Sequence, residues 1–199
     1  MGRRSDHSRK ELREMIVAEG HRQISEVGFA RFSAREVAKR IGYSIGTIYN
    51  VFGTHDQLIL ALNGRTLELW RAYLERQLEG ETHDRLKRAI EAYFEFAVSH
   101  RHAWTAVYDF HLPEGVQAPD DYQGKVMAIF DFVVAEVARQ LPPERTGEAA
   151  ALARSLLATV HGHCHFALSG TFEYLGETDP VGAALARAKD AVGGREPSA

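Results

Sequence analysis

Hydrophobic positions recur at helical spacing along almost the whole chain. No sustained alternation of polar and apolar residues occurs, which a half-buried strand would need. The prolines all fall between or at the ends of the periodic segments, at Pro113, Pro119, Pro142, Pro143, Pro180 and Pro197. The pattern therefore predicts an all-α protein of about nine helices.

Start and stop signals place the first four helices. The first is expected from about Ser8 to Glu26, with Gly28 as its stop. "SARE" (Ser33 to Glu36) and "THDQ" (Thr54 to Gln57) have the form of capping boxes and open the second and fourth helices. Ser44 caps a short third helix, and the fourth extends to about Leu78. The further helices are expected at about 83–100, 102–110, 120–140, 146–170 and 180–192, the last with Asp179 as N-cap and Pro180 at its first position.

Charge divides the chain into two parts. Residues 1–54 carry a net charge of +4 and residues 55–199 a net charge of −7. A basic head on an acidic body is typical of a small polyanion-binding domain attached to another domain, although a chance distribution on a solvated face would look the same. We expect a three-helix head at 1–54, a six-helix body at 55–192 and a frayed tail at 193–199.

Composition excludes several classes. The chain has 199 residues and no apolar run of the ~18 residues that a membrane span needs. Its basic N-terminus lacks the apolar stretch of a secretory signal, and its single cysteine suits a reducing compartment. We therefore expect a cytoplasmic protein with no membrane partner.

The segment "SAREVAKRIGYSIGTIYNVF" (Ser33 to Phe52) has the pattern of a helix-turn-helix, in which two short helices flank a glycine turn. The second helix of such a motif lies in the major groove of DNA, and its first residues approach the bases. Gly46 would allow close approach of the backbone, Thr47 offers a hydroxyl, and Tyr49 can reach a phosphate. Ile48 and Phe52 are expected in the core.

The stretch "FSAREVAKRIGYSIGTIYNVFGTHDQL" (Phe32 to Leu58) resembles the DNA-binding head of the TetR family of bacterial transcriptional regulators. The glycine after the first helix, the "GTIY" of the recognition helix, Phe52 and Leu58 fall at the family's spacing, over roughly residues 12–62. The resemblance implies double-stranded DNA as a partner, in the form of a palindromic operator. The residues expected to contact it are Ser33, Arg35, Ser44, Ile45, Gly46, Thr47, Tyr49, Asn50 and His55.

Two positions depart from the family's pattern. Val51 stands where the family often has histidine, and His55 stands where it often has lysine, so contacts to phosphate are expected to be weaker there. An N-terminal arm with Arg3, Arg4, Arg9 and Lys10 could compensate, unless it is only a solvated tail. Glu19–Gly20 replaces a small apolar pair, which predicts looser packing of the first helix.

The resemblance also implies a C-terminal ligand-binding and dimerisation domain. The last two large helices, at 146–170 and 180–192, would pair with a second copy to form a homodimer. An apolar stripe on the first of them agrees with this, or else packs inside the monomer: Leu152, Leu156, Val160 and Ala167. Aromatic residues concentrated in the body would line a cavity for a small apolar or aromatic effector, although each of them could instead be core. The chosen effector residues are Trp104, Tyr108, His161, His165 and Phe166.

The stretch "VHGHCHF" (160–166) raises the question of a metal site. On a helix His161 and His165 share a face, while His163 points away, so only one pair of ligands remains. We expect no metal, no cofactor and no catalysis, since no enzyme motif is present. The alternatives kept open are a metal-responsive regulator that uses His161 and His165, a metal-dependent enzyme and a structural helical protein. The function predicted is a repressor that its effector releases from the operator.

Overall fold

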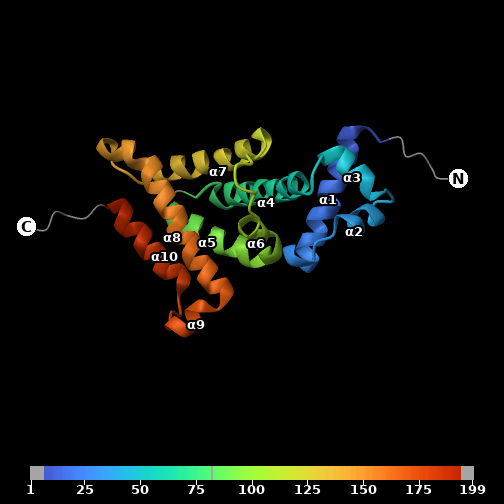
Figure 1. Cartoon of the computed structure of the whole chain (residues 1–199). Coiled ribbons are helices and arrows are strands. Elements are labelled where there is room, and N and C mark those ends of the chain that lie inside the picture. The colour runs from blue at the N-terminus through green and yellow to red at the C-terminus, as the bar shows by residue number, and fades with distance from the viewer. Residues whose placement is uncertain (1–6, 82, 194–199) are drawn as a thin grey trace, which may run out of the picture. The chain divides into compact units, whose positions relative to one another are not determined.

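The computed structural model describes residues 7–81 and 83–193. These residues form ten α-helices and two short 3-10 helices and contain no strand, as the pattern predicted, and nine of the α-helices have seven residues or more (Figure 1). The elements are α1 (Arg9–Val27), η1 (Phe29–Arg31), α2 (Ala34–Arg40), α3 (Ile45–Phe52), α4 (His55–Leu78), α5 (Arg85–Ser99), α6 (Arg101–Asp109), α7 (Asp120–Ala138), η2 (Pro143–Glu148), α8 (Ala149–Ser169), α9 (Thr171–Leu175) and α10 (Pro180–Gly193). The frayed tail was expected at 193–199, but Gly193 is the last residue of α10, and the rest of that tail lies outside the described residues.

The helices form two compact units. Unit 1 consists of Met1–Leu69, as far as it is described, with His100–Lys125, and unit 2 of Trp70–Ser99 with Val126–Ala199, again as far as described. Helices α4 and α7 each belong to both units: the first part of each helix lies in unit 1 and the rest in unit 2. The functional boundary expected at residues 54 and 55 stays a prediction.

Unit 1 is built around the first three helices. Buried side chains of α1, α2 and α3 meet those at the start of α4, with Ile16, Val37, Ile48 and Leu58 all fully buried. Helix α6 packs against α1 and brings Ala103 and Ala106 into the same core. Burial of such side chains is the main force that holds short helices together.

Local signals set the helix starts. Ser8 and Glu11 form a capping box at α1, in which each side chain accepts from the other residue's amide. The "SARE" capping box is only half formed: the Ser33 hydroxyl accepts from the Glu36 amide, but the Ser33 amide donates to Gln23 Oε1 at 2.9 Å. The expectation that Glu36 reaches back was wrong, because Glu36 binds Arg40 instead.

The looser packing expected at Glu19–Gly20 was also wrong. Gly20 is buried, and a Cβ built on it would lie 2.8 Å from Leu62 Cδ2 of α4. The missing side chain is what lets α1 and α4 approach closely at this point. Glu19 is held by ion pairs to Arg22 and Arg40.

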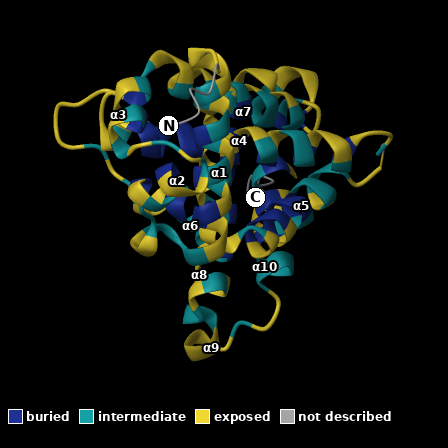
Figure 2. Ribbon diagram, turned by 90° about the vertical axis from the view of Figure 1, so that its right-hand side faces the viewer, coloured by how far each residue is buried: buried dark blue, intermediate teal, exposed yellow. Residues whose placement is uncertain are grey.

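Unit 2 is organised by α8 and α10, which lie side by side (Figure 1) and both contact α5. Asp179 caps α10 as expected, because its carboxylate accepts from the Gly182 amide at 2.9 Å. The pattern missed the short helix α9, which Figure 2 shows mostly as exposed ribbon and which presents Tyr174 and Leu175 to solvent.

The apolar stripe expected on the dimer surface lies partly inside unit 2. Leu156 and Val160 are buried and line a cavity within the unit. At these positions the alternative, packing inside the monomer, is correct. None of the helices described is both long and apolar enough to cross a bilayer.

Candidate functional site

The turn between α2 and α3 fixes the helix-turn-helix. Gly42 has a φ of +78°, a conformation that residues with a side chain rarely adopt. Its amide donates to Lys39 O, and the next amide, of Tyr43, donates to Ala38 O at 2.9 Å. These two bonds form a Schellman motif, which ends α2 and turns the chain sharply into α3.

Helix α3 has one buried face and one open face. Ile48 and Phe52 are buried in the core of unit 1, as expected. The Ser44 hydroxyl accepts from the Thr47 amide and lies 3.0 Å from the Thr47 hydroxyl, so it caps the helix. The remaining face carries the residues predicted to contact DNA. Of the nine predicted residues, Arg35, Ser44, Gly46, Tyr49, Asn50 and His55 are exposed, and Ser33, Ile45 and Thr47 are half-buried.

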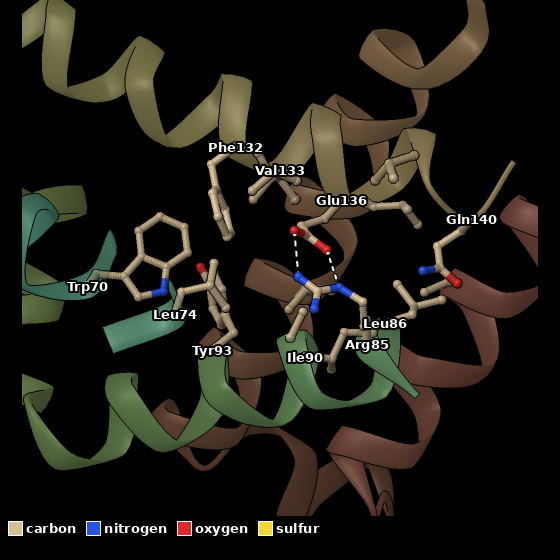
Figure 3. Close-up of a pocket in the computed structure, with 16 residues that line it drawn as sticks. Trp70, Leu74, Arg85, Leu86, Ile90, Tyr93, Phe132, Val133, Glu136 and Gln140 are labelled. Atoms are coloured by element: carbon tan, nitrogen blue, oxygen red, sulfur yellow. Dashed lines mark hydrogen bonds and ion pairs between the residues drawn. The ribbon is translucent and has the colours of Figure 1, made fainter. Parts of the chain in front are cut away.

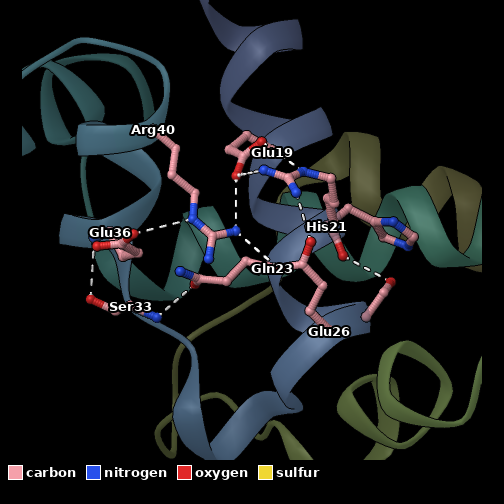
Figure 4. Close-up of polar contacts among 9 residues, drawn as sticks. Glu19, His21, Gln23, Glu26, Ser33, Glu36 and Arg40 are labelled. Atoms are coloured by element: carbon pink, nitrogen blue, oxygen red, sulfur yellow. Dashed lines mark hydrogen bonds and ion pairs between the residues drawn. The ribbon is translucent and has the colours of Figure 1, made fainter.

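The basic residues of α2 differ in what they bind. Arg40 donates to three carboxylates, those of Glu19, Glu26 and Glu36, at 3.0–3.3 Å (Figure 4). Hydrogen bonds from Arg40 hold the pKa of Glu26 below its usual range. Arg35 and Lys39 have no carboxylate partner among the described residues. The network therefore clamps α2 to α1 and leaves Arg35 and Lys39 as the cations on α2 for a phosphate.

The positions that depart from the family pattern lie at the edge of this face. Arg9 Nη2 donates to Val51 O at 3.5 Å, so one arginine of the expected arm meets the end of α3. The ring of exposed His55 lies beside that of Phe32 in a tilted arrangement, with ring centroids 6.1 Å apart. Arg3 and Arg4 of the arm lie outside the described residues.

Polar contacts join the head to α4 and α6 within unit 1. His21 Nε2 lies 3.1 Å from Thr66 Oγ1 of α4. Burial, and then the charges of Arg65 and His100, lower the pKa of His21 to about 4, so its ring is neutral at pH 7. Buried Asn63 of α4 donates to Ala106 O of α6 at 3.1 Å. A movement of α4 would therefore strain or break its hydrogen bonds to α1 and α6.

Unit 2 contains an apolar cavity of about 70 Å³ between α4, α5, α7, α8 and α10 (Figure 3). We call it the unit 2 cavity. It is lined by Trp70, Leu74, Arg85, Leu86, Ala89, Ile90, Tyr93, Phe132, Val133, Glu136, Val137, Gln140, Leu156, Leu157, Val160 and Ala188.

One ion pair interrupts the apolar lining of this cavity. Arg85 Nε and Nη2 donate to the two carboxylate oxygens of Glu136 at 2.8 and 2.9 Å (Figure 3). The same guanidinium donates through Nη1 to Leu78 O at 2.8 Å and to Glu81 O at 2.7 Å. Hydrogen bonding to Glu136 holds the pKa of Arg85 above its usual range. The pair thus ties α7 to the α4–α5 turn.

None of the five residues chosen for the effector lines the unit 2 cavity. His161 comes nearest, because its Nδ1 lies 2.9 Å from the hydroxyl of Tyr93, which does line it. His165 and Phe166 are exposed on α8. Trp104 and Tyr108 lie in unit 1, in edge-to-face contact at 5.3 Å, the first buried and the second exposed. Their role with an effector stays a prediction.

The histidine cluster has the geometry expected from a helix. The rings of His161 and His165 lie 6.0 Å apart on one face of α8, while His163 Nδ1 hydrogen-bonds with Thr159 O. Cys164 is buried, which raises the pKa of its thiol to about 12. Within the part of the chain that is described, no three His, Cys, Asp or Glu side chains form a group that could hold a metal ion.

Sequence reasoning missed the residues that matter most to the cavity. Arg85 and Glu136 are 51 positions apart, so no local pattern could pair them. Gln23 is a polar residue of α1, yet it is buried and its Oε1 accepts a hydrogen bond from the Ser33 amide. The available signal for its burial was its position in α1, three residues after Gly20 and next to Ile24, which are both buried.

Two family models match the chain, one near each end, and both describe the same family of regulators. Residues 16–62 match the model of the bacterial regulatory proteins of the tetR family, and residues 86–192 match that of the tetracyclin repressor-like C-terminal domain. A curated relative is the HTH-type transcriptional regulator HbdR of Aromatoleum sp. (strain CIB), 29% identical over 101 residues. That alignment covers 50% of this chain and 44% of HbdR, so the chain spans less than half of that relative's length.

Solved structures share the fold over nearly the whole chain. A protein of unknown function from Rhodococcus sp. RHA1 is 25% identical with a TM-score of 0.73, over 95% of this chain and 97% of its own. The multidrug binding protein EbrR, solved in complex with imidazole, is 18% identical with a TM-score of 0.65, over 96% of this chain and 99% of its own. Because the C-terminal model alone covers more than half of the residues, the chain belongs to the TetR family, a family of transcriptional regulators rather than enzymes.

Proposed function

We propose that this chain is a ligand-responsive repressor that binds a palindromic operator as a homodimer and is released by a small apolar or aromatic effector. The observation that carries the proposal is the two-sided α3. Its apolar side is anchored by Ile48 and Phe52, while Tyr49 and Asn50 lie exposed on the other side. A rigid helix with an open polar face is what reading of the major groove requires.

The α8 helix offers a surface for the second copy. Ser155, Ala158, Gly162 and Phe166 follow one another at helical spacing on the side that faces away from the cavity, with Gly162 half-buried and the other three exposed. No atom lies within 4 Å of the position that a Gly162 Cβ would take. Small side chains would allow close approach of a two-fold related α8, and Phe166 would supply apolar area.

The unit 2 cavity supports binding of the effector. Its volume of about 70 Å³ is well below the roughly 300 Å³ or more of sites that hold drug-sized ligands. An effector would therefore bind an expanded arrangement of α4, α5 and α7 more tightly than this one. Helix α4 also contacts the head through Thr66. Tighter binding of the effector to the expanded arrangement would therefore change which positions of the recognition helix α3 are populated.

The test is footprinting on DNA that flanks the gene of this protein. We expect a protected palindrome, and we expect Thr47→Ala combined with Tyr49→Ala to lose it without loss of helical content. The same assay with zinc and with a chelator examines the metal-responsive alternative that uses His161 and His165. Failure of the wild-type protein to protect any site would refute the proposal.

A further inference from the structure

The charged groups in the unit 2 cavity are Arg85 and Glu136, and the other side chains of its lining are uncharged. A charge in an apolar cavity costs free energy unless it is paired, so the pair restricts which ligands can enter.

Arg85 is held in place independently of Glu136. Its Nη1 donates to two backbone oxygens, Leu78 O and Glu81 O, while Nε and Nη2 form the edge that faces the carboxylate. If Glu136 moved away, the guanidinium would keep its position and present that edge to the cavity. Two parallel N–H groups in this geometry can bind both oxygens of a planar carboxylate, as they bind those of Glu136 in this structure.

Glu136 has a second partner. Its Oε1 also accepts from Arg139 Nη1, and the Arg139 side chain is 59% exposed. Glu136 could therefore leave Arg85 and stay paired on the solvent side of α7. An exchange of one carboxylate for another would leave neither Arg85 nor Glu136 without an opposite charge.

A cationic ligand would not have this advantage. If it bound Glu136, it would leave Arg85, whose side chain is 21% exposed, with two carbonyl oxygens and no anion. A neutral apolar ligand would gain nothing from the ion pair. The asymmetry between the fixed arginine and the movable glutamate therefore favours an anion.

We propose that the unit 2 cavity binds a molecule with an apolar body and one carboxylate, and that this carboxylate replaces Glu136 on Arg85. The apolar body lies among Trp70, Tyr93 and Phe132, which Figure 3 shows on the same side of the ion pair. This inference names the effector class and so rests on the proposed function. It also gives Glu136 a role as an internal competitor, which weakens binding and ties α7 to α5 when the cavity is empty.

Isothermal titration of the full chain with 4-phenylbutyrate and with 4-phenylbutyramide tests the inference without DNA. We expect the acid to bind at least about tenfold more tightly than the amide, because only the acid can form the charged pair. In Glu136→Gln the acid should bind more tightly still, by roughly threefold or more, while the affinity of the amide stays the same. A gain in affinity cannot come from misfolding.

Arg85→Gln should abolish the preference for the acid. Arg187→Gln is the matched control, since Arg187 pairs with exposed Asp190 and does not line the cavity. Equal affinities of acid and amide, no binding of either, or a preference that survives Arg85→Gln would each overturn the inference. Footprinting separates the two proposals. If the protein protects an operator but does not bind the acid, only the inference about the cavity fails. If it binds the acid but protects no operator, only the proposed repressor function fails.

Discussion

Arg35 and Arg40 lie on the same short helix, yet their surroundings give them different roles. Arg40 is bound by three carboxylates from α1 and α2, and Arg35 is exposed with no carboxylate among the described residues to bind it. A guanidinium that is already paired must give up its partners before it can bind a phosphate, whereas a solvated one has only water to lose. Residue type and position on a helix therefore do not suffice to assign a DNA contact.

Substitution of Arg35 tests this distinction. We expect Arg35→Gln to weaken operator binding roughly threefold to tenfold and to reduce the slope of log affinity against log salt by about 1, because one phosphate contact is lost. Arg40→Gln, the matched control, should lower the thermal midpoint of unfolding and leave that slope unchanged. Affinities measured between 50 and 200 mM salt provide the comparison, and equal slopes for Arg35→Gln and wild type would contradict the assignment.

His21 should make stability depend on pH. Its pKa is about 4 in the folded protein, against an ordinary value of 6.5, so between these values the unfolded chain binds a proton that the folded chain does not. The folded protein holds this ring neutral, and the resulting contribution to the free energy of unfolding is fully present above pH 6.5 and is lost as the pH falls towards 4. The full shift corresponds to about 3 kcal/mol, and with allowance for the partly exposed ring we expect about 2 kcal/mol.

Urea unfolding at pH 7.0 and 4.5 measures this effect. His21→Gln keeps a group that can hydrogen-bond with Thr66. Between pH 7.0 and pH 4.5 its free energy of unfolding should fall by about 2 kcal/mol less than that of the wild type. His111→Gln, at an exposed histidine, should behave as wild type does. Identical losses in His21→Gln and wild type would show that the ring does not titrate in this range.

At the scale of the helix, the sequence predicted most of what local chemistry determines. Ser44, Gly42 and Asp179 end or begin helices as expected, because each signal acts within a few residues. The short α9 was missed, although Gly170 and Gly176 on either side of it both have positive φ. Two glycines six positions apart were the signal for a separate turn of helix.

Features that depend on contacts between distant helices were not predictable in this way. Gly20 was expected to loosen α1, but it lies opposite Leu62 at a point where α1 and α4 pack closely. The residues expected to line an effector cavity were Trp104, Tyr108, His161, His165 and Phe166, and none of them lines the unit 2 cavity, which lies around Trp70 and Tyr93. Helical spacing tells which side chains share a face, and only the tertiary arrangement tells what that face meets.

Packing of α1 against α4 leads to a prediction about Gly20. We expect Gly20→Ala to lower the free energy of unfolding by about 1–3 kcal/mol, because the new Cβ would lie 2.8 Å from Leu62 Cδ2. Gly124→Ala in α7 is the control, since nothing lies within 4 Å of its Cβ position and alanine should stabilise that helix by about 0.5–1 kcal/mol. Denaturant titration measures both variants, and a Gly20→Ala protein as stable as wild type would mean that the Leu62 side chain or α1 can shift at no cost.

At the scale of the whole molecule, an operator with two-fold symmetry requires two copies of α3 at a fixed spacing, so assembly and DNA binding should be lost together. Ala158 is exposed on α8, between Ser155 and Gly162 on the proposed dimer surface. In a two-fold interface that is closely packed around small residues, Ala158→Arg would introduce two buried charges with no partner.

We expect Ala158→Arg to be a folded monomer in sedimentation analysis, with wild-type helical content and at least about tenfold weaker operator binding. Met127→Arg adds the same charge at an exposed apolar residue of α7 and should remain dimeric. Titration with 4-phenylbutyrate gives a further criterion. Residues of a single chain form the lining of the unit 2 cavity in this structure, so we expect the monomer to bind the acid as well as the dimer does. An Ala158→Arg protein that is still dimeric would place the subunit interface elsewhere. A monomer that still binds the operator with wild-type affinity would instead show that each head reads DNA independently.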